Sequence, residues 1–567
     1  MLINKKKFCI LAAFCLLSLN IFSQHAKPKL NSTYKYVNSG RYRTYPVTTE
    51  KKIFDAFGPG EKKEFNDSFS AADVKGLIKG YVTRIEKKCI NQFKASEELI
   101  RWFENNLKAR EAFWLALDEQ YDDIAVAINI FDTLRKKNPD KIIKYYHLAV
   151  AIAVVWDSPD AVSSSRWSCI WGYQVNQFLP LLKYEEVFDY FTNPKYQRLF
   201  VFKPDKLRWP LMTHLVDFDL SKKEYIWSLK NYNSKKRKIQ TTYKDVKYDY
   251  QKLQTRSPIV RGEYTLQNLL RLGGICGDQS HFASRIAKCF GIPSMKVSGM
   301  GRHGGSGHAW AGYLIGKKGR PALEFTGRYR GDFYYTGDVF NPQTRTLGME
   351  RFVALMYDGA SLNYSKYIDS LALAKIAQKI KVSDPKLSVN ITKEALALNY
   401  YCGPAWVLLM DHVYKGTADR KVGVKWFNLM TKKLKAHPDL TILCFNSFMR
   451  CIPKEEVKTR SRYYNILFTM YKNRPDLQIQ LRCLQCRELA DADKALKGLT
   501  LAIQTCIDNG KEGGLLLPLV KICVEIAKEK KLEEKVKPYM KKIKFPMKRG
   551  NKISQSYTEF KKLLNSL

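Results

Sequence analysis

The stretch LRLGGICGDQSHFASRIAKCFGIP, residues 270–293, decides how this chain folds around its most informative cysteine. Residues with a helical pattern follow Cys276, and Asp278 lies where a helix-capping side chain is expected. The Gly-Ile-Pro triplet at 291–293 ends the pattern. We therefore predict a helix from about Asp278 to Cys289, with Cys276 at its start. There the thiol could be half of a disulfide, a metal ligand, a small buried apolar group or a nucleophile.

A helix N-terminus favours the last of these roles, because its free N–H groups and its dipole stabilise a thiolate. Gly273 and Gly274, which precede the cysteine with only Ile275 between, permit a close approach of the chain and leave room for a substrate carbonyl. The N–H of Cys276 itself could donate to an oxyanion. We expect Gly274, Gly277 and Gln279 to line a substrate cleft or to support the oxyanion, although Gln279 could instead cap the helix.

The sequence after the helix predicts a strand (SMKVSGM, 294–300), a Gly-rich loop and then two further strands, HAWAGYLI and PALEFTGRY, joined by a turn at 316–320. His308 opens the first of these two strands. It would accept the thiol proton and later protonate a leaving amine. Trp310 would form a wall of the cleft, and Glu324, on the returning strand, would orient the imidazole.

Together these motifs resemble the transglutaminase-like superfamily, a papain-like group of cysteine enzymes. The resemblance covers about residues 255–345 and rests on GIC at 274–276, GIP at 291–293 and HAW at 308–310, in that order. It implies a core of one helix on an antiparallel sheet, a Cys–His–acid triad, and acyl transfer through a thioester. The flanking segments look like those of large exported bacterial proteins that carry this domain.

The chain departs from the family at the third member of the triad. The family's residue is Asp, often followed by Pro-Thr, whereas this strand reads LEFTG. Glu324 is therefore the best-placed acid. Asp332, Asp338 and Asn341 are later candidates, which require a longer hairpin.

Composition indicates packed globular cores and a basic surface. The 567 residues are 45% hydrophobic and 13% aromatic, and the net charge is +42. This excess favours anionic partners, such as an anionic envelope polymer, and the alternative is a simple solvated basic surface, which we favour over specific nucleic-acid binding. Without a zinc-finger or RNP-type motif, nucleic-acid binding is the weakest alternative. Nothing in the sequence implies a metal ion or an organic cofactor.

The first 24 residues have the basic start and apolar centre of a signal peptide. An uncleaved signal anchor is the alternative. No later segment has the apolar length of a membrane span. We therefore expect an exported protein, periplasmic or extracellular.

The other cysteines and glycines carry less information. Of 13 cysteines, two lie in the first 24 residues, and the 11 that remain are an odd number with irregular spacing, unlike a disulfide scaffold. Cys483 and Cys486 form the one CxxC, which we interpret as helix packing, with a metal or redox site as the alternative. GMGRHG at 299–304 matches GxGxxG, but a strand follows it where dinucleotide binding requires a helix.

The expected fold class is α+β, with a papain-like core between helical domains. Residues 236–265 carry β-formers in alternation, so short strands are expected there. The last domain resembles tetratricopeptide-type α-hairpins without a clear 34-residue period. The expected domains are a signal peptide (1–24), an irregular arm (25–63), an N-terminal helical domain (64–160), a connecting segment (161–235), a transglutaminase-like domain (236–347) and a C-terminal helical domain (348–567).

The expected function is acyl transfer or hydrolysis at amide bonds of proteins or peptides. Attack by water on the thioester would make the protein a peptidase or amidase, and attack by a lysine amine would make it a cross-linking enzyme. The alternative is a catalytically degenerate binding scaffold, which would use its C-terminal helices to bind a protein partner.

Overall fold

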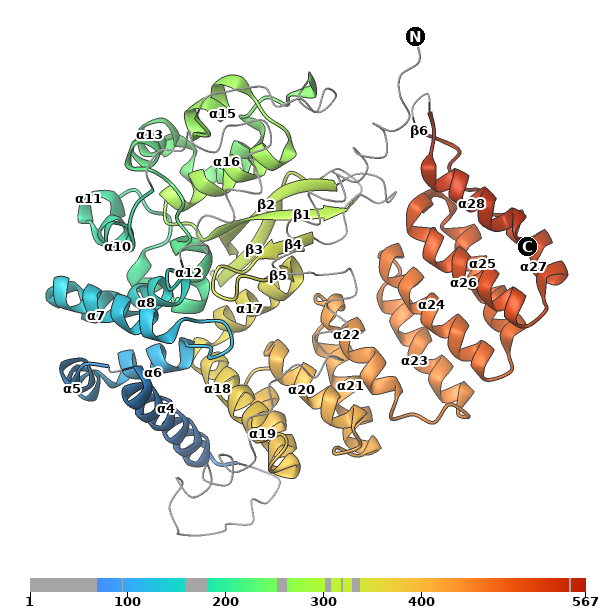
Figure 1. The fold of residues 1–567 in the computed structure, drawn as a ribbon, viewed down its shortest axis with the longest axis horizontal. Helices are drawn as coiled ribbons and strands as arrows, with labels where there is room; N and C mark the ends of the chain where they lie inside the picture. Colours follow the sequence, from blue (N-terminus) through green and yellow to red (C-terminus); the bar gives the residue numbers. More distant parts are fainter. Residues whose placement is uncertain are drawn as a thin grey trace. The chain divides into compact units, whose positions relative to one another are not determined.

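The quoted stretch forms helix α16 (Cys276–Cys289), which starts at the cysteine and ends before Gly291. It packs on a five-stranded antiparallel sheet with the strand order β3-β2-β1-β4-β5 (Figure 1). The strands are β1 (Ser294–Met300), β2 (Gly307–Lys317), β3 (Arg320–Thr326), β4 (Gly337–Phe340) and β5 (Leu347–Met349). The three predicted strands are confirmed, and β4 and β5 extend the sheet beyond β1.

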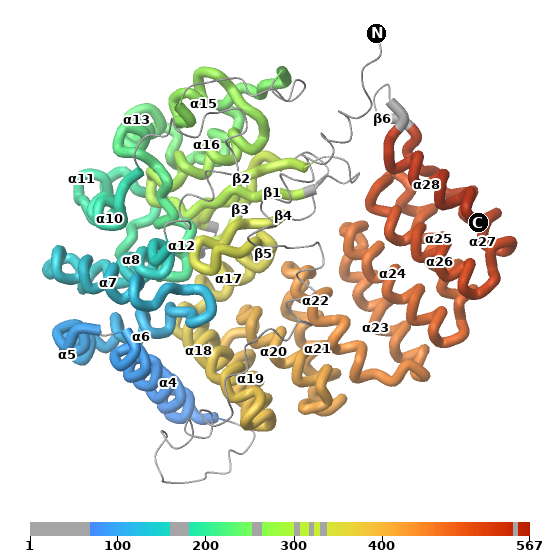
Figure 2. The backbone as a smooth tube through the Cα atoms, viewed as in Figure 1, coloured from blue at the N-terminus to red at the C-terminus, as the bar shows by residue number. Residues whose placement is uncertain are grey.

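This computed structural model describes residues 69–93, 95–158, 181–251, 263–300, 307–317, 320–328, 337–549 and 552–567 (Figure 2). The expected signal peptide, the expected arm and the Gly-rich loop at 301–306 lie outside the described residues. The described residues of 64–381 and 385–567 belong to one compact unit, so the domain boundaries expected within them stay predictions.

Helices cover both faces of the sheet. Side chains along a strand point alternately to its two faces, so one strand can contact helices on both sides. On one face, Ser294 Oγ donates to the carbonyl of Ser284 in α16, at 2.6 Å. On the other face, Trp310 Nε1 donates at 2.8 Å to Oε2 of Glu350, the first residue of α17 (Glu350–Leu362). The expected α+β core with a helix on an antiparallel sheet is thus present, and α17 is an addition to it.

Two buried ion pairs attach α16 to the segment between α12 (Trp209–Val216) and α13 (Lys222–Tyr232). Arg285 donates from Nε and Nη2 to the two carboxylate oxygens of Asp219, at 2.5 and 2.9 Å, and both side chains are almost completely buried. Lys288 Nζ pairs with one carboxylate oxygen of Asp217 and also donates to the Asp217 carbonyl at 3.1 Å. Burial alone would raise the pKa of Asp219, but Arg285 outweighs it and holds that pKa below its ordinary value.

The N-terminal helices pack into a shared apolar core, as the helical spacing predicts. The chain breaks between two of these helices at Asn138, and Pro139 occupies the first turn of the next helix, where its missing N–H costs no hydrogen bond. These helices are α4 (Ala71–Phe93), α5 (Glu97–Asn105), α6 (Leu107–Ala116), α7 (Ile124–Lys137) and α8 (Pro139–Val155).

After β5 the chain is helical, and successive helices pack against one another (Figure 1). A short hairpin of β6 (Lys548–Arg549) and β7 (Lys552–Ile553) interrupts the helices that were expected to run to the end. The helices are α18 (Tyr364–Ile380), α19 (Pro385–Leu398), α20 (Gly403–Tyr414), α21 (Arg420–Lys433), α22 (Pro438–Met449), α23 (Val457–Met470), α24 (Pro475–Asp491), α25 (Ala495–Asp508), α26 (Leu517–Glu529), α27 (Glu533–Met540) and α28 (Gln555–Asn565).

The strands expected within residues 236–265 are wrong for the part that the structure describes. The chain forms a 3-10 helix, η3 (Asn233–Lys244), and Tyr248 makes an isolated bridge with Gly274. Ile239 and Thr242 are buried three residues apart, which matches the three-residue turn of a 3-10 helix. The alternating pattern of β-forming residues in the sequence did not indicate this three-residue spacing of buried side chains.

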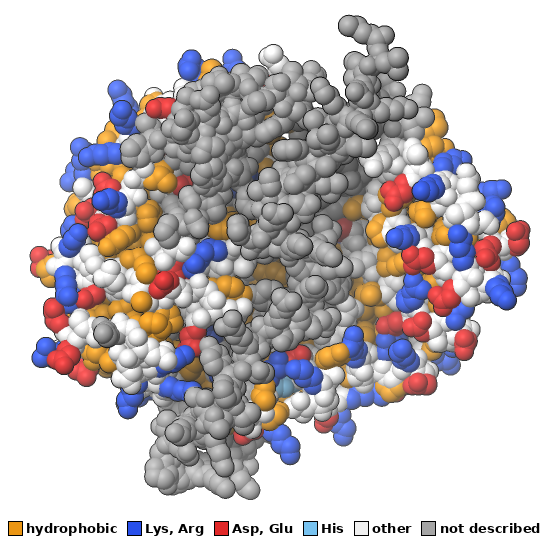
Figure 3. All heavy atoms as spheres, in the orientation of Figure 1, with side chains coloured by type: hydrophobic (Ala, Val, Ile, Leu, Met, Phe, Trp, Pro, Cys, Tyr) orange, Lys and Arg blue, Asp and Glu red, His pale blue; other side chains and the backbone are white. Residues whose placement is uncertain are grey.

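Charge is dispersed on the helical surface. Lys and Arg side chains lie between Asp and Glu side chains on the described helices of the face shown in Figure 3. Within the described ranges, no helix is long and apolar enough to cross a membrane.

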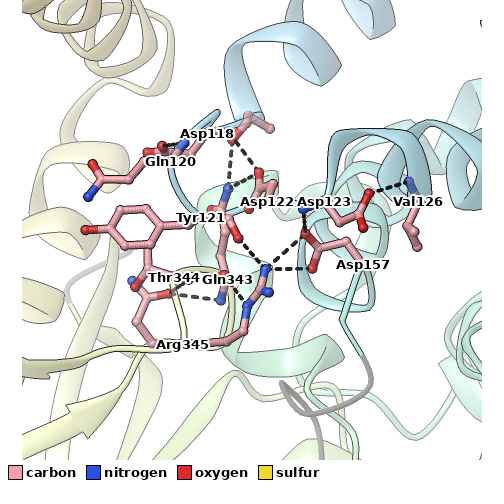
Figure 4. A network of polar contacts seen from close by, with 12 residues as sticks. Asp118, Gln120, Tyr121, Asp122, Asp123, Val126, Asp157, Gln343, Thr344 and Arg345 are labelled. Carbon is pink, nitrogen blue, oxygen red and sulfur yellow. Dashed lines mark hydrogen bonds and ion pairs between the residues drawn. The ribbon is translucent and has the colours of Figure 1, made fainter. Parts of the chain in front are cut away.

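A polar network attaches the turn between β4 and β5 to the N-terminal helices (Figure 4). Arg345 donates to both carboxylate oxygens of Asp157 and to the carbonyl of Tyr121, at 2.6–3.1 Å. Gln343 Nε2 donates to Asp122 at 3.0 Å. Burial raises the pKa of Asp122 to about 7, and the charge of Asp157 adds to this rise.

The network predicts a pH-dependent stability. Because the pKa of Asp122 is raised in the folded protein, its contribution to the free energy of unfolding is complete below about pH 4 and is lost as the pH rises to about 7. Asp122→Asn removes this titration. The free energy of unfolding of the wild type minus that of the variant should therefore fall by up to about 1.4 kcal/mol per pH unit between about pH 4 and pH 7. Urea unfolding of both proteins at pH 4–8 measures it, and a constant difference would contradict the assignment.

The buried ion pairs of α16 predict a second stability effect. Asp219→Asn leaves the Arg285 charge buried beside an uncharged amide, so we expect a loss of about 3–5 kcal/mol in the free energy of unfolding. The control is Glu525→Gln, which breaks an exposed pair with Arg487 and should cost at most about 1 kcal/mol. Urea unfolding compares the two, and equal losses would show that burial does not set the cost.

Candidate functional site

Cys276 is the first residue of α16, and Asp278 caps the helix around it. Asp278 Oδ2 accepts the N–H of Ile275 at 2.8 Å, and Oδ1 accepts the hydroxyl of Tyr264 at 3.1 Å. The Asp278 side chain is fully buried. The carboxylate therefore lies within the first turn, where the helix dipole stabilises it, and the predicted cap is confirmed.

The two glycines before the cysteine permit a close approach to a neighbouring segment. Gly273 has φ +79°, and a Cβ there would lie 2.7 Å from the carbonyl oxygen of Lys247. The N–H of Gly274 donates to that same oxygen at 3.0 Å, and its carbonyl accepts the N–H of Asp249 at 2.9 Å. The expectation that Gly274 supports an oxyanion is therefore wrong for its N–H, which is engaged with the main chain of Lys247.

The Cys276 thiol is half-buried between the start of α16 and strand β2. Burial raises its pKa, while hydrogen bonds from the N–H groups of Ala309 and Gly277, and the charge of Lys296, lower it by a smaller amount. Among the described residues, no atom beyond the adjoining chain lies within 4 Å of the point where a Gly277 Cβ would be. The space on the Cβ side of Gly277 is thus open, while its N–H is hydrogen-bonded to the thiol.

His308 lies on β2, next to the residue whose N–H contacts the thiol. Its Nε2 lies 2.7 Å from the carbonyl oxygen of Gly327. A carbonyl can only accept, so Nε2 carries the hydrogen and Nδ1 carries the lone pair. Burial lowers the pKa of His308, and the Gly327 carbonyl offsets part of that change. The imidazole is therefore neutral in the resting protein, with its basic nitrogen at Nδ1.

β3 separates from β2 close to His308 and to Ala309, whose N–H contacts the thiol. The pairing of these strands ends at Ala311 and Thr326. Beyond this pair, the Gly327 carbonyl turns to the His308 ring, and the hydroxyl of Tyr243 donates to the Ala309 carbonyl at 2.7 Å. Gly327 has φ +87°, and a Cβ there would lie 2.5 Å from the Tyr243 ring. The end of the ladder thus leaves the Ala309 N–H to the thiol and the Gly327 carbonyl to the imidazole.

The structure does not bring Glu324 to His308, so this expectation is corrected. Glu324 pairs with Tyr313 in the β2–β3 register and is exposed. It therefore lies on the face of the sheet opposite to that of His308. It is also five residues away from the position that this register places across from His308. The short turn between the two strands sets this offset.

Of the later candidates, the two in the described part of the chain do not take its place. Asp338 lies on β4 and pairs with Ser298 of β1, so β1 separates it from β2. Asn341 Oδ1 accepts the N–H groups of Gln343 and Thr344 within the next turn. Asp332 lies outside the described residues. Within the described part of the chain, the orienting partner of His308 is a main-chain carbonyl.

Gln279 and Trp310 stabilise the core around the site and do not line a cleft. Gln279 is buried, and its Nε2 donates to the carbonyl of Val246 at 2.8 Å. Trp310 is fully buried, with its indole N–H on Glu350 and its ring 6.0 Å from that of His308. Sequence reasoning missed Gly327 and Glu350. Gly327 lies within the predicted strand PALEFTGRY, where a glycine could have signalled the end of β3 at Thr326, but Glu350 follows the sheet with no motif around it.

Among the described residues, no group of three or more His, Cys, Asp or Glu side chains is arranged to hold a metal ion. The CxxC of Cys483 and Cys486 lies in the C-terminal helices, away from Cys276. Its second cysteine, Cys486 of α24, contacts Cys523 of α26. Cys486 and Cys523 are both buried in an apolar cluster, as the helix-packing interpretation expects.

No protein-family model matches this chain, and neither a curated protein nor a solved structure matches it. The case for its function therefore rests on the geometry of its own residues.

The raised thiol pKa and the lowered imidazole pKa predict how Cys276 reacts with pH. The resting pair is a neutral thiol and a neutral imidazole, so alkylation by iodoacetamide should keep rising with pH beyond about 8.5, the pKa of an ordinary thiol. Peptide mass analysis of alkylated Cys276 at pH 5–10 measures the rate. A plateau below pH 7 would indicate a preformed thiolate–imidazolium pair and contradict this assignment.

Proposed function

We propose that this protein is a transglutaminase-like cysteine enzyme that acts on amide bonds of proteins or peptides through a thioester. The observation that carries the proposal is the placement of the Cys276 thiol at a helix N-terminus, against the N–H of Ala309, the residue that follows His308 on β2. The tautomer of His308 adds support, because its lone pair at Nδ1 is the form a general base requires.

The chemistry uses these groups in two balanced steps. In the first, the Cys276 sulfur attacks the substrate carbonyl carbon while Nδ1 of His308 takes the thiol proton, and the carbonyl oxygen becomes an oxyanion beside the N–H of Gly277. The C–N bond then breaks, and the imidazolium returns the proton to the leaving amine. In the second step, water or an amine attacks the thioester, His308 removes its proton, and the protonated thiol leaves.

We propose the substrate and the location from the charge of the chain and from its N-terminal sequence. Lys296 lies close enough to the thiol for its charge to lower the thiol pKa, and the chain carries a net charge of +42, so an acidic protein or an anionic envelope polymer suits the site. The basic and apolar N-terminal sequence supports export to the periplasm or beyond. The successive C-terminal helices offer a surface for a protein partner.

One observation favours a second function, a binding scaffold that keeps the fold without catalysis. The carboxylate expected to orient the imidazole is absent from the described surroundings of His308, since Glu324 lies on the other face of the sheet. In that case the C-terminal helices would bind a partner, and the cysteine would be an unreactive thiol.

Acetylation by 4-nitrophenyl acetate separates the two functions. If His308 is the base, His308→Gln should slow formation of S-acetyl-Cys276 by about 100-fold, which lies within the usual effect of losing a general base. Mass analysis of the labelled peptide measures the rate. Cys276→Ala is the negative control, and Cys289→Ala, which removes a fully buried thiol of the same helix, should leave the rate unchanged.

Equally slow acetylation of Cys276 in wild type and in His308→Gln would contradict the enzyme and support the scaffold. If the enzyme is confirmed, adding an alkylamine to the acetylated protein tests the outcome of the second step. Faster deacetylation with formation of the N-alkylacetamide identifies a transferase, and an unchanged rate with acetate as product identifies a hydrolase.

A further inference from the structure

Glu350 is a fully buried carboxylate at the edge of the candidate site, outside every sequence motif discussed above. It is the first residue of α17, so its charge lies at the positive end of that helix dipole. Its Oε2 accepts the indole N–H of Trp310 at 2.8 Å, and its Oε1 pairs with Arg328. Each carboxylate oxygen thus holds a different part of the sheet.

These contacts lead directly to His308. Trp310 lies two residues after His308 on β2, and Arg328 follows Gly327, whose carbonyl accepts the Nε2 hydrogen of the imidazole. The Arg328 guanidinium also lies over the Trp310 ring, 5.2 Å from its centre. Glu350 therefore connects the strand that carries the imidazole with the segment that carries its hydrogen-bond acceptor.

We infer that Glu350 is the positioning residue of this site, in place of the carboxylate expected on β3. Its ion pair with Arg328 fixes the chain after β3, so that the Gly327 carbonyl stays on Nε2 and the lone pair stays on Nδ1. The inference rests on the proposed function of Cys276 and His308. It deepens that function, because it explains how the imidazole keeps the basic nitrogen at Nδ1 with a neutral main-chain acceptor.

The physical reason is the strength of a buried charge pair. Past Thr326 the ladder between β2 and β3 has ended, so its hydrogen bonds no longer hold Gly327 beside β2. A fully buried carboxylate demands charged or hydrogen-bonding partners, and the planar guanidinium supplies both from one direction. The side-chain pair of Glu350 and Arg328 thus replaces the missing main-chain hydrogen bonds of the strand pair.

The chain offers a matched control in its N-terminal helices. Glu86 of α4 is also buried, accepts the indole N–H of Trp114 at 3.0 Å on Oε1, and pairs with Arg110. The side chains of Arg110 and Arg328 have nearly the same exposure, 16% and 17%. This second Trp–Glu–Arg group stabilises the fold but has no connection to His308. Glu86→Gln therefore reports the cost of neutralising such a carboxylate by itself.

The test measures the His308 tautomer in the full chain by ¹⁵N NMR of histidine-labelled protein, with His308→Gln to assign the signal. Wild type should show hydrogen on Nε2. Glu350→Gln, which keeps an acceptor for Trp310 but removes the charge, should populate the Nδ1–H form and slow acetylation of Cys276 by at least about tenfold. Glu86→Gln should change neither reading, even where urea unfolding shows a similar loss of stability.

A second pair of variants covers a failure of Glu350→Gln to fold. Arg328→Lys keeps the charge but loses the planar fork, and it should shift the tautomer in the same direction by a smaller amount, with Arg110→Lys as its control. Wild-type tautomer and acetylation rate in the folded variants at Glu350 and Arg328 would overturn the inference. Failure of the proposed function would give a different result. Cys276 would then be acetylated at the wild-type rate in His308→Gln, while the His308 tautomer in Glu350→Gln would still test the role of Glu350.

Discussion

The candidate site depends on the point where β3 separates from β2. Up to the pair Ala311–Thr326 the two strands use their main-chain groups on each other. Beyond it, these groups become available, so that the N–H of Ala309 contacts the thiol and the carbonyl of Gly327 contacts the imidazole. A ladder continued by two more residues would pair Ala309 with Arg328 and so occupy the N–H of Ala309. The end of one strand pair thus creates the polar environment of the site.

Burial determines the charge state of this environment. It raises the pKa of Cys276 and lowers that of His308, and the nearby N–H groups and carbonyl only partly oppose it. A neutral pair costs less desolvation than two ions in the same place. The proposed enzyme would therefore form its charges during the reaction, where the N–H of Gly277 and the helix dipole stabilise them, and not in the resting state.

Two buried ion pairs hold the helix that carries the thiol. Arg285 and Lys288 of α16 are buried against Asp219 and Asp217, and every one of these groups has its partner inside the protein. Such pairs fix geometry more than they add stability, because desolvation offsets most of their attraction. Together with the Asp278 cap they fix the direction and the depth at which α16 reaches the sheet.

The sequence predicted the parts of the site that depend on local pattern. The helix from Cys276, the strand at His308 and the Gly-Ile-Pro stop at 291–293 all follow from periodicity, capping and turn residues, which act over a few positions. The 3-10 helix η3 escaped this reasoning because its buried spacing is visible only once a partner surface covers it.

The third member of the site required tertiary structure. Glu324 was the nearest acid along the chain, but strand register and alternation, which depend on how two strands pair, place it on the other face of the sheet. Gly327 and Glu350 came into view only through contacts between elements. The sequence by itself determined which residues can carry the chemistry. Only the folded sheet decided which of them meet, because a one-residue change of register exchanges the faces of a strand.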